Sequence, residues 1–172
     1  MRKLAVLAMA AAVLAGGTGA RAQEPAKPGP EHELLKKMEG TWATTMKADG
    51  MEFKGTMTYK MELGGLWLVG SLESDLGGQK FYGRGMDTYD PAKKKYVGYW
   101  FDSMSATAMV MEGNYDKGTK TMTMAGEGPG PDGKPAKWKS VSKMPDDDTI
   151  VMNMFVGDAK EPMFTITYKR KK

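Results

Sequence analysis

EFKGTMTYKME, residues 52–62, alternates strictly between two kinds of side chain. One set of positions carries Phe53, Gly55, Met57, Tyr59 and Met61, and the other carries lysine, threonine or glutamate. A period of two, with one apolar and one polar face, is typical of a half-buried antiparallel strand. Residues 134–144 have a similar pattern, with Trp138 opposite a row of lysines. Both segments predict a sheet that turns one face to a core and the other to water.

Turn residues such as Asp49-Gly50 and Gly77-Gly78 recur on both sides of these segments and separate about ten predicted strands. The predicted strands are 41–48, 52–62, 66–75, 79–89, 95–103, 106–115, 119–127, 134–144, 148–157 and 162–170. Because the connections are short, neighbours in sequence should pair, and such a meander closes to remove its edges. We expect an all-β, single antiparallel up-and-down barrel of eight to ten strands. A two-sheet sandwich is the alternative, and it needs longer crossings.

The N-terminal residues are typical of a secretory signal. Arg2 and Lys3 precede an apolar run from Leu4 to Leu14, and Ala20-Arg21-Ala22 fits an A-x-A cleavage site. We therefore predict a cleaved signal peptide over 1–22, a proline-rich linker over 23–30 and a barrel domain over 31–172, exported to the periplasm or beyond a bacterial cell. An uncleaved anchor is the alternative, but the apolar run is shorter than the roughly 20 residues of a membrane-spanning helix.

Composition narrows the classes of function. The chain has 25 basic and 21 acidic residues, and without residues 1–22 the counts become 22 and 21. Such a balanced charge gives no field that would attract nucleic acid or anionic membrane. The chain has no cysteine, which excludes thiolate metal sites, cysteine nucleophiles and a lipid-anchored N-terminus.

The segment before the first predicted strand combines two features. EHELLKKME, residues 31–39, places its leucines and Met38 on one side of a short amphipathic helix that Gly40 ends. Gly40-Thr41-Trp42 then opens the first strand with a G-x-W motif. A short helix leading into G-x-W resembles the opening of lipocalins and their relatives.

Further blocks extend the resemblance over roughly residues 33–172. They are EGTWATTMKADG, the run from Met61 to Met104, EGNYDKGTKTMTMAGE, DDDTIVMNMF and FTITYKRK. In this order they are similar to the bacterial family called domain of unknown function 1579, which is grouped with lipocalin-like, or calycin-type, barrels. The resemblance implies a barrel fold, with Trp42 plugging the closed end and stacking under Arg170 of the last strand. Such a cation–π contact contributes about 0.5–2 kcal/mol. The alternative is that Trp42 serves as a ligand platform.

Methionine is unusually frequent, and several methionines alternate on one strand face, such as Met122 with Met124 and Met152 with Met154. Flexible thioethers fill or line an interior that adapts to varied apolar molecules. The alternative is that the methionine thioethers bind Cu(I). Such sites usually include a histidine, and no predicted strand holds one.

The interior is therefore the candidate ligand site. Its predicted lining residues are Met57, Tyr59, Met61, Trp67, Tyr82, Arg84, Trp100, Met122, Met124, Trp138, Met152 and Met154. Trp67, Tyr82 and Trp100 have apolar neighbours on both faces, so either face of their strands could be the inner one. Arg84 is flanked by two glycines, so alternation does not decide its orientation either. If it points inward it would anchor a carboxylate head group, and if outward it is a solvated charge.

No catalytic constellation is visible. His32, the only histidine, is expected at the surface near the helix start, so neither a Ser-His-Asp triad nor an axial haem ligand on a strand is available. The Asp146–Asp148 run lacks the spacing of an EF-hand and fits a hairpin turn. We predict a non-catalytic binder of a small apolar or amphipathic ligand, without metal or cofactor. The second hypothesis is a filled barrel that acts as a structural or envelope interaction domain.

Overall fold

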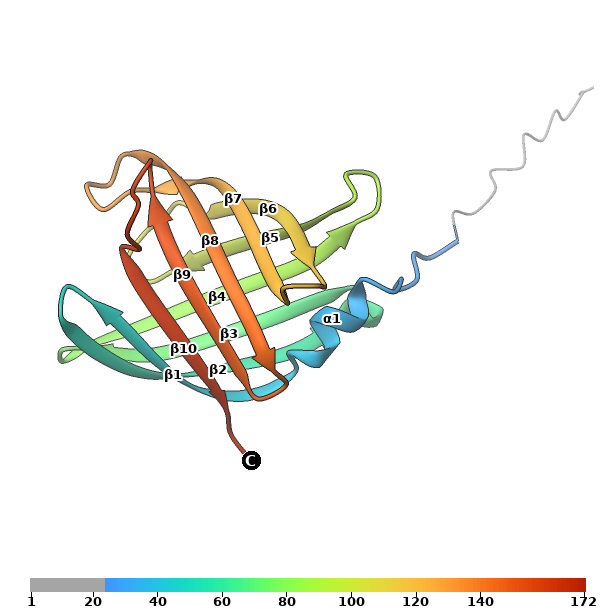
Figure 1. Cartoon of the computed structure of the whole chain (residues 1–172), viewed down its shortest axis with the longest axis horizontal. Helices are drawn as coiled ribbons and strands as arrows, with labels where there is room; N and C mark the ends of the chain where they lie inside the picture. Colours follow the sequence, from blue (N-terminus) through green and yellow to red (C-terminus); the bar gives the residue numbers. More distant parts are fainter. Residues whose placement is uncertain (1–23) are drawn as a thin grey trace, which may run out of the picture.

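The computed structural model describes residues 24–172. The predicted signal peptide, residues 1–22, and Gln23 lie outside the described residues. The described chain forms one closed antiparallel barrel with a short helix at one end (Figure 1). Its strands are β1 (Gly40–Ala48), β2 (Met51–Glu62), β3 (Trp67–Leu76), β4 (Gln79–Asp90), β5 (Lys95–Asp102), β6 (Met109–Asp116), β7 (Thr121–Pro129), β8 (Pro135–Asp146), β9 (Thr149–Val156) and β10 (Phe164–Arg170). The predicted fold class is confirmed.

Each strand pairs with its neighbours in sequence, and β1 pairs with β10 to close the sheet. All ten strands occur where the sequence predicts them, with ends that differ by at most three residues. The sandwich alternative is excluded, because a single continuous ladder runs around the barrel. Closure leaves no exposed sheet edge.

The helix α1 (His32–Lys37) and the short 3-10 helix η1 (Leu63–Gly65) lie at the same end of the barrel. This helix end also carries the β4–β5, β6–β7 and β8–β9 turns, because the strands alternate in direction. Leu35 is buried and packs on Leu68 and Tyr96. The amphipathic pattern of the helix thus covers this end with its apolar side.

His32 does not lie at the surface as predicted. It is 6% exposed, its Nδ1 accepts a hydrogen bond from the backbone N–H of Gly29 at 3.0 Å, and its ring meets Tyr89 edge-on. The prediction was wrong because the turn before α1 folds back and presses the first helical residue onto the barrel.

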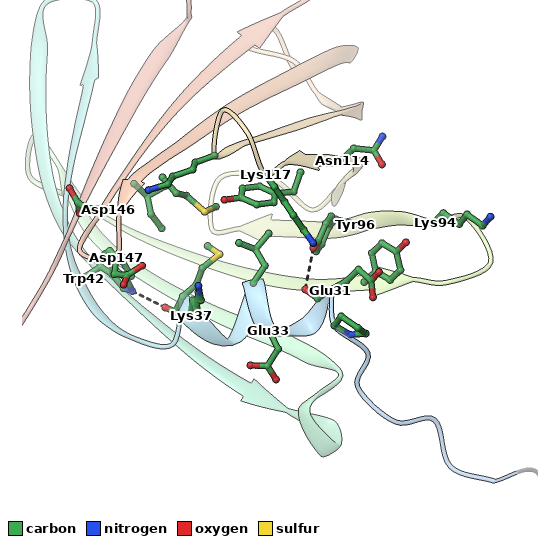
Figure 2. A pocket seen from close by; sticks show the side chains of 18 residues that line it. Glu31, Glu33, Lys37, Trp42, Lys94, Tyr96, Asn114, Lys117, Asp146 and Asp147 are labelled. Atoms are coloured by element: carbon green, nitrogen blue, oxygen red, sulfur yellow. Dashed lines mark hydrogen bonds between the residues drawn. The ribbon is translucent and has the colours of Figure 1, made fainter.

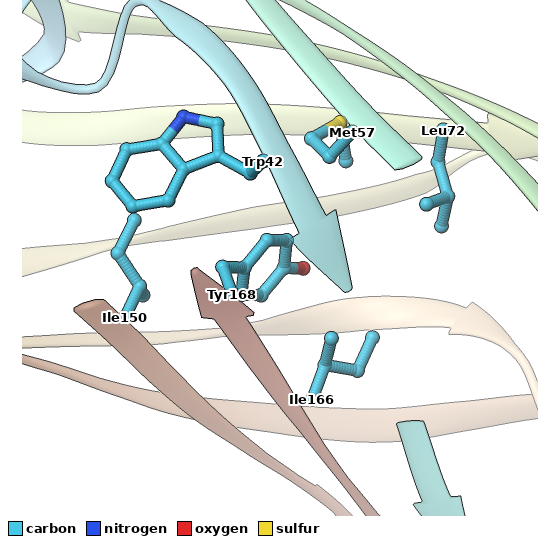
Figure 3. Close-up of a cluster of buried hydrophobic side chains, with 6 residues drawn as sticks. All are labelled: Trp42, Met57, Leu72, Ile150, Ile166 and Tyr168. Atoms are coloured by element: carbon cyan, nitrogen blue, oxygen red, sulfur yellow. The ribbon is translucent and has the colours of Figure 1, made fainter. Parts of the chain in front are cut away.

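Three clusters of buried side chains occupy the interior. The cluster of Figure 3 joins strands from both ends of the sequence and consists of Trp42, Met57, Leu72, Ile150, Ile166 and Tyr168. A second lies under α1 and includes Leu35, Leu68, Tyr96 and Met122. The third lies toward the other end of the barrel and consists of Met111, Trp138 and Met154.

Candidate functional site

Most of the predicted lining residues point into the space that the ten strands enclose, the lumen. These residues pack in or against the three interior clusters: Met57, Tyr59, Met61, Trp100, Met122, Met124, Trp138, Met152 and Met154. They come from β2, β5, β7, β8 and β9, so five of the ten strands contribute methionine thioethers or aromatic rings to the lining.

Three predicted lining residues lie on the outside of the barrel instead. Tyr82 is 50% exposed, and Arg84 is exposed, its Nη1 donating to the carbonyl of Gly83. Trp67 pairs with the exposed Tyr99 on the outer wall, with ring centroids 6.1 Å apart. The prediction of an interior position was wrong for Trp67 and Tyr82, and the open question about Arg84 is settled: it points outward.

Two glycines explain the wrong orientation predicted for Tyr82 on β4. The inner face of β4 carries Gly83 and Gly85, over which the indole of Trp100 lies. A Cβ on Gly83 would collide with that ring, and one on Gly85 would be 3.4 Å from it. The inner face of β4 therefore has two consecutive positions without a side chain, and Trp100 of the neighbouring strand β5 covers them.

Four interior side chains, each three residues from the helix-end terminus of its strand, are not completely covered. Tyr59, Asp87, Met124 and Met152 belong to the inner face, yet each is only partly buried. A side chain that the wall surrounds keeps accessible surface only where it borders internal space. Part of the lumen is therefore open to molecules the size of water.

Asp87 is the functional candidate that sequence reasoning missed. It lies on the inner face of β4, next to Gly98 of β5, and burial raises the pKa of its carboxyl from 3.8 to about 7. Burial raises the pKa of the Tyr168 hydroxyl, and the charge of Asp87 raises it further. The pKa of the Tyr59 hydroxyl is also raised, first by burial and then by Tyr168 and Asp87. Alternation puts Asp87 on the same face of β4 as Phe81, but the sequence does not decide which face of this strand is the inner one.

A cavity of about 570 Å³ opens at the helix end of the barrel (Figure 2). Its floor is apolar and includes Leu34, Met38 and Trp42. Its rim is charged and carries Glu31, Glu33, Lys37, Lys94, Lys117, Lys120, Asp146 and Asp147. Tyr96 donates a hydrogen bond to the carbonyl of Glu31 at 3.1 Å, which fastens the start of α1 beside this opening. The volume falls within the range of about 300–1,000 Å³ of small-molecule sites.

The predicted closure of the barrel is present. The Arg170 guanidinium covers the Trp42 ring and donates to the carbonyls of Lys37, Glu39 and Asp147. Gly40 has φ +121°, and a Cβ there would be 3.0 Å from Nη1 of Arg170. A side chain at position 40 would therefore be strained and would push the guanidinium away.

Residues 24–172 contain no group of three or more His, Asp or Glu side chains placed to hold a metal ion. Asp146 accepts from the N–H of Asp148 within the β8–β9 turn. Within the same residues no helix has the length and apolarity needed to cross a membrane.

The comparison with protein families identifies the chain. The family model for the protein of unknown function DUF1579 matches residues 27–170. The chain belongs to the DUF1579 family. No curated protein matches the DUF1579 chain significantly. A designed protein described as a fluorescence-activating β-barrel is similar in structure, with a TM-score of 0.47 and 14% sequence identity over 80% of this chain and 96% of the designed one.

Proposed function

We propose that this DUF1579 protein is a non-catalytic barrel that binds a small apolar or amphipathic molecule in its lumen. The observation that carries the proposal is the partial accessibility of inward-facing Met124, Met152 and Tyr59. Apolar surface that touches water costs about 25 cal/mol per Å². A ligand that displaces internal water from these side chains would recover that free energy.

The chemistry of the lining supports a broad range of ligands. Met57, Met122, Met124, Met152 and Met154 contribute unbranched thioether side chains, which change rotamer at low cost. Trp100 and Trp138 add flat apolar surface, and each has its indole N–H bonded, to Asp102 and to the carbonyl of Pro129. A surface of this kind accommodates varied apolar shapes.

The test compares two variants that add the same ring on opposite faces of the wall. Ser142→Phe places a phenyl group in the lumen, because Ser142 lies opposite Met122 and Met152. Thr123→Phe places it outside on the adjacent strand β7, where Thr123 is exposed. Nile red, a neutral apolar dye, is titrated into each protein, and decanol is then added as a competitor.

Wild type and Thr123→Phe are expected to bind the dye saturably and to release it to decanol. Ser142→Phe is expected to weaken binding at least tenfold while circular dichroism shows an unchanged sheet. If the wild type binds neither dye nor decanol, the lumen serves only as a core, and the structural or envelope interaction domain becomes the better account.

We also propose that the protein is exported and acts outside the cytoplasm. The support is the arrangement of Arg2-Lys3, the apolar run and Ala20-Arg21-Ala22. N-terminal sequencing of the protein recovered from a cell's exported fraction is expected to begin at Gln23. A cytoplasmic product that retains residues 1–22 would contradict this.

A further inference from the structure

Asp87 lies on the inner face of β4, three residues before the strand ends at the helix end of the barrel. Its partner positions are Leu68 on β3, which is fully buried, and Gly98 on β5. A Cβ on Gly98 would collide with Oδ1 of Asp87 and would be 3.4 Å from the Met124 methyl group. The Asp87 carboxyl therefore occupies the space beside Gly98 that a side chain at position 98 would fill.

The Asp87 carboxyl has no hydrogen-bond partner among residues 24–172, whereas the second lumen acid, Asp102, is satisfied. Oδ2 of Asp102 accepts from Trp100 Nε1 at 2.9 Å, and its Oδ1 accepts from the N–H of Met104 at 2.8 Å. Asp87 keeps accessible surface inside the barrel. Burying a carboxylate without a hydrogen-bond partner in a largely apolar enclosure costs free energy. A ligand that brings a hydrogen-bond donor to Asp87 would offset this cost.

Two tyrosines complete a polar group in this part of the lumen. The Tyr59 ring lies over Gly70, where a Cβ would be 2.8 Å from it, and Tyr168 reaches inward from β10. Burial is the main cause that raises the pKa of both tyrosine hydroxyls, and the charge of Asp87 acts in the same direction. The three groups come from β2, β4 and β10, within an interior otherwise made mostly of methionine, aromatic and aliphatic side chains.

No basic side chain of the described strands faces the lumen beside Asp87, and the other inward acid, Asp102, is the last residue of β5, at the end of the barrel away from α1. Among the inward-facing strand positions, charged side chains occur at Asp87, Asp102 and Arg170. Arg170 lies at the helix end, where backbone carbonyls and Asp148 engage its guanidinium. The strand lysines belong to the outer face, so no cation of the described chain neutralises Asp87.

We infer that Asp87, with Tyr59 and Tyr168 beside it, anchors the polar head of the ligand, and that the lumen selects apolar molecules bearing a cationic amine over those bearing a carboxylate. The inference rests on the proposed function and fixes its ligand class. An ammonium group would donate to Asp87 and to the tyrosine oxygens while its apolar chain lies among the methionines. A carboxylate in the same place would face a like charge.

The test uses three ligands that share one chain and differ in the head group: decylamine, decanol and decanoic acid. Each is titrated below its micelle concentration into the purified full chain by calorimetry at pH 8.5, where the amine is protonated. The variants are Asp87→Asn and, as a matched control on the other lumen acid, Asp102→Asn. Circular dichroism and a urea transition confirm that each variant is folded.

The wild type and Asp102→Asn are expected to bind decylamine at least tenfold more tightly than decanol, with decanoic acid weakest. Asp87→Asn is expected to remove this preference and to leave decanol binding within about twofold of wild type. Equal binding of the three ligands, or an amine preference that survives Asp87→Asn, would overturn the inference and leave the proposed function standing. If none of the three ligands binds, the proposed function fails as well.

Discussion

The guanidinium carbon of Arg170 lies 4.1 Å from the centroid of the Trp42 ring, so the first and the last strand of the barrel are joined by a stacked pair. Trp42 is 1% exposed, and its Nε1 donates to the carbonyl of Met38 at 2.9 Å. Arg170 also donates to the carbonyl of Lys37 at 2.7 Å. The same pair therefore closes the sheet and fixes the end of α1.

Replacement of Trp42 by alanine is expected to lower the free energy of unfolding by about 3–5 kcal/mol, as for large aromatic side chains in cores. Arg170→Ala is expected to cost less, because part of that side chain stays hydrated. Urea unfolding of both variants and of the double variant measures the coupling between them. The contact predicts a coupling of about 0.5–2 kcal/mol.

Arg170→Lys is the control for charge alone. Lysine keeps the positive charge but loses the flat fork that covers the indole and reaches several carbonyls at once. It is expected to recover only a minor part of the stability that Arg170→Ala loses. Strictly additive effects of the Trp42 and Arg170 substitutions would contradict an energetic contact between the two side chains.

The positions of the strands can be predicted from the sequence, because alternation and turn residues depend only on neighbouring positions in the chain. The contact between Trp42 and Arg170 is predicted from the resemblance of the G-x-W opening to lipocalins. Segments 52–62 and 134–144 each have one polar face, and their orientation is predicted correctly. The strand at 79–90 has Phe81 and Tyr82 side by side, so alternation alone fits either face. Its orientation depends on Trp100, which covers Gly83 from the next strand.

The polar group in the lumen could not be predicted for a related reason. The raised pKa of Asp87 comes from burial, and the strands that enclose its carboxyl come from distant parts of the chain. His32 likewise looks like a surface residue among glutamates, and only its contact with Tyr89 shows where it packs. The alternation of side chains shows which residues share a face of a strand. Which side chains meet across the lumen depends on the hydrogen-bond register of all ten strands.

Two glycines on the inner face of β4 offer a matched test of where the Trp100 ring lies, since it covers both of them. Gly83→Ala would place a methyl group inside the indole and is expected to destabilise the fold by about 1–3 kcal/mol, as overpacking does. It should also shift tryptophan emission. Gly85→Ala meets the ring at ordinary contact distance and is expected to cost less than about 1 kcal/mol. Equal losses of stability in urea for the two variants would show that Trp100 does not lie over Gly83.

The ionisation of Asp87 links stability to pH with a definite sign. Its pKa is about 7 in the folded protein, against an ordinary value of 3.8. Between about pH 4 and pH 7 the folded state therefore holds a proton that the unfolded state has lost, and the free energy of unfolding falls as pH rises. The stability from this proton is fully present below the unfolded pKa and is lost above pH 7. Internal water reduces the effect below the limit of about 4 kcal/mol set by the full shift.

Asp87→Asn removes this titration while keeping the size of the side chain. The variant is expected to match wild type near pH 4 and to become progressively more stable than wild type up to about pH 7, beyond which the difference stays constant. Urea unfolding at intervals from pH 4 to pH 8.5 measures the difference. Asp75→Asn on the outer face is the control, because the Gly78 N–H and Lys80 lower the pKa of Asp75. That variant is expected to be less stable than wild type at neutral pH, with the gap closing as the solution becomes acidic. A flat difference for Asp87→Asn would show that this carboxyl ionises in the lumen as it does in water.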